Sequence, residues 1–254
     1  MSVHSTIDIS LLCKHIKDKN QPKNCILLTT GSLNPIHRSH INNLIQTKSY
    51  LENLDYNVLC GYLSPTHENY VRNKLGHLYI KSNDRLKMCQ EAIRESQQDD
   101  WLCVDQDEIN ADDFIDFPEV CELFHERLNN LVVKEKKLLV KQIRVIYVCG
   151  LDHFNKCSSV RGLAKDHLGV AVIYRPGYNE HMIKHVLENS KNIFYIPFTD
   201  EERHELKDIS STLIRNNYST NQSCDSLTYP SVIEHLNKIL SKHGAENETH
   251  IGLS

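Results

Sequence analysis

This sequence of 254 residues has few of the features that mark membrane, secreted or fibrous proteins. It holds only seven prolines and nine glycines, and neither a Pro/Gly/Ser-rich linker nor an internal repeat interrupts it. We therefore expect one main folded domain. No apolar stretch approaches the ~18 residues that a membrane-spanning helix needs, so we expect no membrane partner. Residues 1–20 have neither a basic nor a continuous apolar segment, so a secretory signal is not expected either.

Cysteine is present, but not in the patterns that make disulfide frameworks or zinc sites. The nine cysteines are odd in number and scattered, without a Cys-x-x-Cys pair or a Cys/His cluster of zinc spacing. Several lie inside apolar runs, which is typical of reduced thiols packed in a core. We therefore expect no protein metal site and an intracellular location, cytoplasmic by default, with the nucleus left open.

Positive charge is also in deficit. There are 29 Lys and Arg against 33 Asp and Glu, a formal net charge of -4. Because non-specific nucleic-acid binding needs a basic surface, we expect no nucleic-acid partner. Hydrophobic residues at 40% and charged residues at 24% are ordinary for a soluble globular protein, and the length allows a substantial core.

Apolar runs of strand length recur along the chain. They are Cys25–Thr30, Val58–Leu63, Trp101–Val104, Val145–Cys149, Val170–Tyr174 and Ile193–Pro197. Continuous apolar character is typical of strands buried on both faces of a parallel sheet, and segments with helical spacing lie between the runs. The alternation predicts an α/β fold, a Rossmann-like doubly wound, mainly parallel sheet with helices on both faces. Such sheets bind ligands at the carboxyl ends of their strands.

We predict three segments. Residues 1–24 form an N-terminal extension with a short helix at about Ile7–Lys17, residues 25–243 form the folded domain, and residues 244–254 form a flexible C-terminal tail.

The first functional motif joins an apolar strand to a helix. It reads Gly31-Ser32-Leu33-Asn34-Pro35-Ile36-His37-Arg38-Ser39-His40. Pro35 suits the first turn of a helix, whose free N–H groups and positive dipole end attract phosphate. His37 and His40 would lie on one side of that turn and donate hydrogen bonds to phosphate oxygens. With 15 histidines in the chain the pair alone is weak evidence, but its position after a strand favours a phosphate site.

The second motif, Ile209-Ser210-Ser211-Thr212-Leu213-Ile214-Arg215, opens another predicted helix. Ser210, Ser211 and Thr212 are candidate N-caps, and their hydroxyls and amides can hold phosphate oxygens. Arg215 lies one turn further on, where its guanidinium can reach the same phosphates. Alone, the motif would indicate an ordinary capped helix; with the first motif, it predicts the other half of a polyphosphate site.

In this order, the two motifs resemble the paired signatures of nucleotidyltransferases, most closely those of the nicotinamide/nicotinate mononucleotide adenylyltransferases. The resemblance runs from about residue 25 to 243 and includes the stretches Gly61–Tyr70, Trp101–Asp105, Cys149–Asp152, Arg175–Gly177 and Tyr229–Val232. It implies an enzyme that transfers AMP from ATP to a mononucleotide, giving NAD or deamido-NAD plus pyrophosphate. It also implies Mg²⁺ brought in with ATP, and members often form homo-oligomers.

The same resemblance assigns roles to individual residues. The catalytic group is His37, His40 and Arg215. The ATP-binding group is Gly31, Ser32, His37, His40, Gly150, Asp152, Ser210, Ser211, Thr212 and Arg215. The group that binds the acceptor nucleotide is Ser32, Asn34, Ser64, Pro65, Tyr70, Lys74, Trp101 and Arg175. Trp101 could stack on a pyridine ring or simply pack in the core, and both interpretations stay open.

The sequence departs from the family pattern in the acceptor half. The usual lysine after the Ser-Pro loop falls on Asn73 by a strict count, which leaves Arg72 or Lys74 as candidates. A second tryptophan is missing beyond Asp152, where His153 or Phe154 could replace it.

Two alternatives follow from these departures. One is a nucleotidyltransferase with another acceptor, such as phosphopantetheine or a phosphorylated alcohol. The other is a nucleotide-binding protein with weak or no catalysis, although the intact motifs argue against it. A dehydrogenase is not expected, because no Gly-x-Gly-x-x-Gly follows the first strand.

Overall fold

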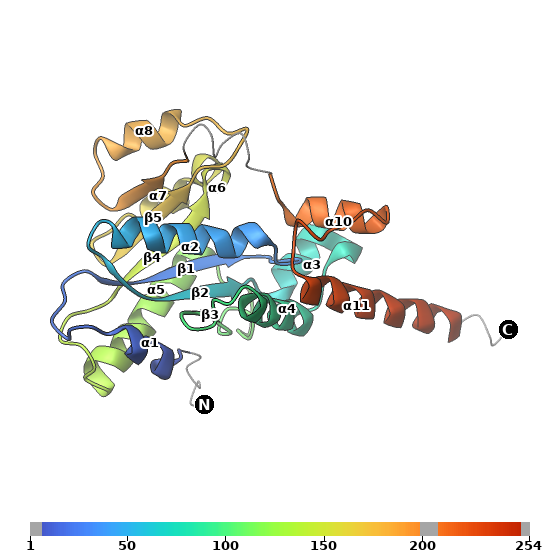
Figure 1. Ribbon diagram of the computed structural model, residues 1–254, viewed down its shortest axis with the longest axis horizontal. Coiled ribbons are helices and arrows are strands. Elements are labelled where there is room, and N and C mark those ends of the chain that lie inside the picture. The colour runs from blue at the N-terminus through green and yellow to red at the C-terminus, as the bar shows by residue number, and fades with distance from the viewer. Residues whose placement is uncertain (1–6, 199–207, 250–254) are drawn as a thin grey trace.

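The computed structural model describes residues 7–198 and 208–249, with side chains as far as residue 239. At its centre lies a six-stranded sheet in the spatial order β3-β2-β1-β4-β5-β6, and every neighbouring pair is parallel (Figure 1). The strands are β1 (Asn24–Gly31), β2 (Asn57–Pro65), β3 (Leu102–Val104), β4 (Arg144–Gly150), β5 (Leu168–Ile173) and β6 (Ile193–Ile196). Each predicted apolar run forms one of them, and the predicted doubly wound parallel fold is confirmed.

Helices cover both faces of this sheet. On one face pack α2 (Arg38–Glu52), α4 (Ser82–Glu95), α10 (Ser211–Ser219) and α11 (Pro230–Thr249). On the other pack α1 (Ile9–His15), α5 (Phe117–Asn129), α6 (Leu151–Lys156), α7 (Ser158–Gly162) and α8 (His181–Leu187). The short elements α3 (Glu68–Leu75) and η1 (Gly76–Leu78) follow β2, and the π-helical turn η2 (Asn130–Glu135) extends α5.

The two-sided cover explains why the strands are apolar throughout. In β1, Cys25 and Leu27 belong to the core under α2 and α4, whereas Ile26 and Leu28 belong to the core under α5. All four side chains are fully buried. Because successive side chains in a strand point to opposite faces, burial of both faces removes the usual polar alternation.

The ends of the chain belong to the same two layers. Helix α1 lies inside the predicted extension, and its Leu11 and Leu12 are buried in the α5-side core. Asp8 begins this helix by accepting a 3.0 Å hydrogen bond from the Leu11 amide. At the other end, α11 continues to Thr249, past the predicted boundary at residue 243, and residues 250–254 lie outside the described part of the chain.

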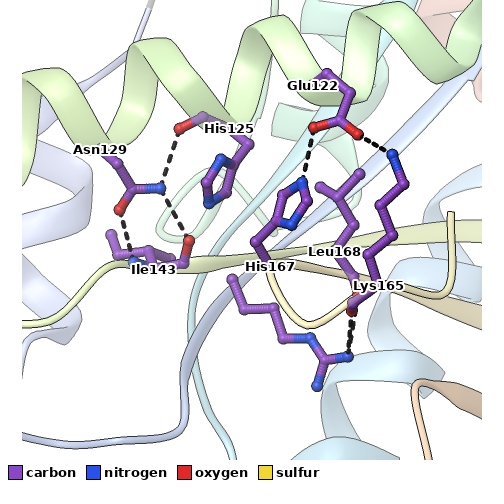
Figure 2. A network of polar contacts seen from close by, with 8 residues as sticks. Glu122, His125, Asn129, Ile143, Lys165, His167 and Leu168 are labelled. Carbon is purple, nitrogen blue, oxygen red and sulfur yellow. Dashed lines mark hydrogen bonds and ion pairs between the residues drawn. The ribbon is translucent and has the colours of Figure 1, made fainter.

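A polar network fastens α5 to the edge of the sheet where β4 and β5 begin (Figure 2). The buried Asn129 amide donates to the carbonyls of His125 and Ile143, both at 3.0 Å, and accepts from the Ile143 amide at 2.7 Å. Nearby, Glu122 accepts from Lys165 at 2.5 Å and pairs with His167 at 2.8 Å. These contacts lie at the amino ends of the strands. They stabilise the packing of α5 on the sheet and do not reach the carboxyl ends of the strands.

Within residues 7–198 and 208–249, none of the helices is both long and apolar enough to cross a membrane. All nine cysteines are free thiols.

Candidate active site

A cleft of about 680 Å³ opens at the carboxyl ends of the strands. Gly31 at the end of β1, Gly150 at the end of β4 and Ile173 at the end of β5 line it. The chain winds from β1 outward to β3, then returns to β4 and winds outward the other way. The border between β1 and β4 is therefore the topological switch point, where open α/β sheets bind their ligands.

The first motif forms the loop after β1 and the start of α2. The helix begins at Arg38, later than the predicted start near Pro35; His37 is its N-cap, and the Asn34–Pro35 peptide in the loop is cis. The His37 amide donates to Nδ1 of His40 at 3.1 Å, and the two imidazoles stack with centroids 3.6 Å apart. Both histidines line the cleft.

The environment keeps both imidazoles uncharged near neutral pH. Burial, and secondarily the nearby Arg175 cation, lowers the pKa of His40 to about 4. Burial, with His40 and Arg175 adding to it, also holds the pKa of His37 well below its usual value. A neutral imidazole still donates one N–H, so each histidine can hydrogen-bond an anionic oxygen.

Two buried polar atoms of cleft-lining residues have no hydrogen-bond partner, Oγ of Ser32 and Nδ1 of His37. Since buried polar groups are nearly always hydrogen-bonded, these two atoms can pair with water or with a ligand that enters the cleft.

The second motif packs directly against the first. Ser210 caps α10 by accepting from the Leu213 amide at 3.2 Å, and it lines the cleft. Oγ of Ser211 donates to the Pro35 carbonyl at 2.8 Å, and an Arg215 guanidinium nitrogen donates to the Asn34 carbonyl at 2.7 Å. The structure thus brings the two predicted motifs together.

Three residues of the second motif that were predicted to hold phosphate lie behind the loop between β1 and α2 and do not line the cleft. Arg215 also donates to Oγ1 of Thr212 at 3.1 Å, while its buried Nε has no partner. Ser211 and Arg215 therefore hold the loop backbone, and Thr212 accepts from Arg215. Contact of these three residues with phosphate stays a prediction.

On the β4–β5 side of the cleft an arginine lies between two carboxylates. Arg175 pairs with Asp152 at 2.9 Å and with Asp208 at 2.9 Å. A Cβ at Gly150 would come within 2.6 Å of an Asp152 carboxylate oxygen, so a side chain at this position would displace that carboxylate. Arg175 was predicted in the acceptor group, yet it lies with Gly150 and Asp152 of the ATP group.

On the other side, the structure distinguishes Arg72 from Lys74. Lys74 lines the cleft together with Tyr70, and its ammonium lies 5.6 Å from the Tyr70 ring centroid. Arg72 instead pairs with Glu68 at 2.5 Å and does not line the cleft. Of the two candidates, Lys74 is the cation available to a ligand.

Trp101 does not reach the cleft. It is 4% exposed, its indole N–H donates to Gln98 at 2.7 Å, and a Cβ at Gly61 would lie 2.9 Å from its ring. Packing against glycine in the core, it presents no free face on which a pyridine ring could stack. Of the two interpretations left open, its position supports core packing.

Three other residues that were predicted to bind the acceptor nucleotide are buried and pack within the protein. The buried Asn34 side chain accepts from the Ile80 amide at 2.7 Å and donates to the Leu78 carbonyl at 3.0 Å, fixing the segment after η1. Ser64 is fully buried, and Pro65 is buried beside it at the end of β2. None of the three lines the cleft.

The cleft contains residues that the sequence analysis missed. Glu108 lines it although only 3% exposed, and accepts from Oγ of Ser64 at 2.8 Å. Phe114 and Phe117 line it as well, and His153 does so while Phe154 is buried in the core. Glu108 and Phe114 lie in the loop that follows β3, a position at the ligand-binding edge that could have singled them out.

A parallel six-stranded sheet, with a cleft at its switch point lined by a helix N-terminus and two neutral histidines, defines a nucleotide-binding α/β protein. The family model described as cytidylyltransferase-like matches residues 28–217. The chain belongs to the cytidylyltransferase-like family.

Known proteins similar to this chain carry one kind of name. The Arabidopsis thaliana nicotinamide/nicotinic acid mononucleotide adenylyltransferase is 26% identical over 229 residues, which cover 85% of this chain and 89% of that protein. The Danio rerio nicotinamide/nicotinic acid mononucleotide adenylyltransferase 2 is 36% identical over 88 residues, 34% of this chain. The match spans only 27% of the Danio rerio protein and 24% of its Xenopus tropicalis counterpart.

Among solved structures, the chain resembles the Plasmodium falciparum nicotinic acid mononucleotide adenylyltransferase in its complexes with APC and with NaAD. The TM-scores are 0.60 and 0.59 at 12% and 13% identity, covering 85% of this chain and 96% of that one. At this identity the likeness bears on the fold alone.

Proposed function

We propose that this protein is an adenylyltransferase that transfers AMP from ATP to nicotinamide or nicotinate mononucleotide, giving NAD or deamido-NAD and pyrophosphate. One observation carries the proposal: the two motifs meet at one cleft, joined by the hydrogen bonds from Ser211 and Arg215 to the loop that ends in His37. The names of the similar proteins, including the Arabidopsis thaliana relative over most of its length, support the same reaction.

In the proposed reaction an acceptor phosphate oxygen attacks the α-phosphorus of ATP in line, and the bond from that phosphorus to the β-phosphate oxygen breaks. Pyrophosphate leaves, so no covalent enzyme intermediate is needed. Such transfers depend on positioning and electrostatic stabilisation, and we therefore assign no general base. His37 and His40 donate N–H groups to the α- and β-phosphates, and the start of α10, with Arg215 behind it, holds the other end.

Mg²⁺ would arrive on the phosphates of ATP and neutralise charge on the leaving oxygens. The described residues include no group of three His, Cys, Asp or Glu side chains arranged to hold a metal. We propose that the ligands of this metal come mainly from the nucleotide. Homo-oligomer formation and the cytoplasmic location remain predictions.

The two sides of the cleft suit two nucleotides. Gly150 and Asp152, on the β4 side, are proposed to meet the adenosine ribose, whereas Tyr70 and Lys74, on the β2 side, are proposed to meet the acceptor. Phe114 stacks on Tyr70 with ring centroids 4.5 Å apart, and Phe117 stacks on Tyr147 at 5.2 Å. These aromatic faces can serve the flat acceptor base in place of Trp101.

The burial of Trp101 in the core also favours a second candidate function, the same reaction with a different phosphate acceptor. The test is pyrophosphate release from ATP and Mg²⁺ with nicotinamide mononucleotide, nicotinate mononucleotide or phosphopantetheine, each product being identified by mass. We expect NAD or deamido-NAD. If only phosphopantetheine supports turnover, the reaction stands but the acceptor is phosphopantetheine. If ATP binds but no acceptor supports turnover, the nucleotide-binding protein without catalysis is favoured.

A further inference from the structure

The acceptor side of the cleft contains a buried carboxyl group that the proposed chemistry does not use. Glu108 comes from the loop after β3, lines the cleft and is 3% exposed. Oγ of Ser64 donates to it at 2.8 Å from the end of β2, and the Thr66 side chain hydrogen-bonds it as well. The Ser64 hydroxyl also lies 3.2 Å from an Asp105 carboxylate oxygen. The hydrogen bonds from Ser64 and Thr66 hold the carboxyl group of Glu108 at the wall of the cleft.

The environment of Glu108 balances its charged and neutral forms. Burial raises its pKa to about 7, opposed by the hydrogen bonds from Ser64 and Thr66. Asp105 raises the pKa further, and Arg85, on α4, lowers it. The other ionisable groups that interact with it are Cys121 on α5 and Tyr147 on β4, and Lys74 and Asp116 line the same cleft.

Aromatic rings line the same cleft as this carboxyl group. Tyr70 and Phe114 stack at an interplanar angle of 20°, and Phe117 and Tyr147 stack at 21°. All four rings belong to residues that line the cleft. Aromatic faces attract a flat cationic ring, and a carboxylate beside them adds to that attraction. The same carboxylate accepts a hydrogen bond from a carboxamide N–H but repels a second carboxylate in a poorly solvated site.

We propose that Glu108 is a specificity-determining residue of the acceptor site, selecting a cationic ring that bears an uncharged carboxamide over one that bears a carboxylate. This inference rests on the proposed function. It predicts that the amide form, nicotinamide mononucleotide, is the better acceptor, and that the preference depends on the charge of this one side chain.

The test compares kcat/KM for nicotinamide and nicotinate mononucleotide in wild type, Glu108→Gln and Glu108→Asp. Glutamine keeps the shape and an acceptor for Ser64 but removes the charge, so the amide-to-acid ratio should fall about tenfold, equivalent to ~1.4 kcal/mol of discrimination. Most of this change should be a gain in kcat/KM for the acid. Aspartate keeps the charge and should keep the preference. Glu119→Gln, an exposed charge loss outside the cleft, should leave the ratio unchanged.

A second readout needs no variant. Both acceptors carry the same phosphate, so its titration cancels in their ratio. In wild type the amide-to-acid ratio should rise between about pH 6 and pH 8, as Glu108 becomes charged, and in Glu108→Gln it should stay flat. If Glu108→Gln does not fold, the wild-type profile still decides.

The outcomes separate the two proposals. Wild-type turnover with a ratio that neither pH nor Glu108→Gln changes would overturn the role of Glu108 and leave the adenylyltransferase intact. If the wild type turns over neither nicotinamide nor nicotinate mononucleotide, both proposals are overturned.

Discussion

At the scale of single residues, the histidine pair shows how burial shapes the chemistry of the cleft. A charged imidazole would attract phosphate more strongly, but burial and Arg175 keep His37 and His40 neutral. In the proposed reaction they act as N–H donors, and the hydrogen bond from the His37 amide to His40 fixes their orientation. Their spacing was readable from the sequence, whereas their neutral state depends on burial in the finished fold.

We predict that His40→Ala lowers kcat by about 10²–10³-fold, the usual effect of removing one donor to a developing oxyanion. Steady-state pyrophosphate release measures this loss, with folding checked by circular dichroism. His181→Ala, at an exposed position outside the cleft, is the matched control and should keep wild-type turnover. A folded His40→Ala protein with nearly full kcat would contradict the assignment.

The depressed pKa of His40 also makes stability depend on pH. In the unfolded chain this imidazole takes up a proton near pH ~6.5, but in the folded protein only near pH 4. The contribution of neutral His40 to the free energy of unfolding is therefore fully present above about pH 6.5. It is lost as the pH falls toward 4, at up to ~1.4 kcal/mol per pH unit. Urea denaturation at several pH values should give a shallower loss for His40→Asn than for wild type. Parallel curves would show that His40 is not linked to folding.

At the scale of secondary structure, the strands were predictable because burial on both faces leaves continuous apolar runs. The start of α2 was placed too early, because a proline in a loop and a proline in a first helical turn look alike in sequence. The core position of Trp101 depends on its contact with Gly61 of the neighbouring strand β2, which no local pattern encodes. The position of Glu108 after β3 could have indicated that it lies near the cleft, but its partners Ser64 and Thr66 come from another strand and loop, so its burial was not readable.

Helix α5 offers a test of scaffold energetics away from the cleft. Asn129→Ala removes three hydrogen bonds and leaves the backbone groups of Ile143 unsatisfied (Figure 2). We predict a loss of about 2–3 kcal/mol in the free energy of unfolding, a fall in Tm of roughly 5–10 °C, and unchanged KM values. Thermal unfolding and steady-state kinetics measure the two effects. Glu126→Ala, exposed on the same helix, should change neither, and a loss below ~1 kcal/mol in Asn129→Ala would contradict the role.

At the scale of the whole molecule, the loop between β1 and α2, early in the chain, is held by contacts from the last quarter of the chain. Besides the bonds from Ser211 and Arg215, Oγ1 of Thr228 donates to the Ile36 carbonyl at 2.8 Å, and the Arg38 amide donates to the Leu227 carbonyl at 3.0 Å. The strand order explains why both motifs meet, but these individual contacts join residues far apart in sequence. No single-sequence pattern specifies them, although both motifs are readable.

Arg215 supports the loop from outside the cleft, and two substitutions test whether it also contributes to ATP binding, as proposed. ATP at 100 times its Kd should stabilise wild type by ~2.7 kcal/mol, seen as a rise in Tm of about 5–10 °C. Arg215→Lys keeps the charge but loses the guanidinium fork, so we expect about tenfold weaker ATP binding and a rise in Tm roughly halved. Thr228→Ala loses a hydrogen bond behind the loop, so it should lower Tm without ATP while leaving the ATP-induced rise unchanged. If Arg215→Lys behaved like Thr228→Ala, Arg215 would serve only to hold the loop, and the triphosphate would depend on the histidines and the N-terminus of α2.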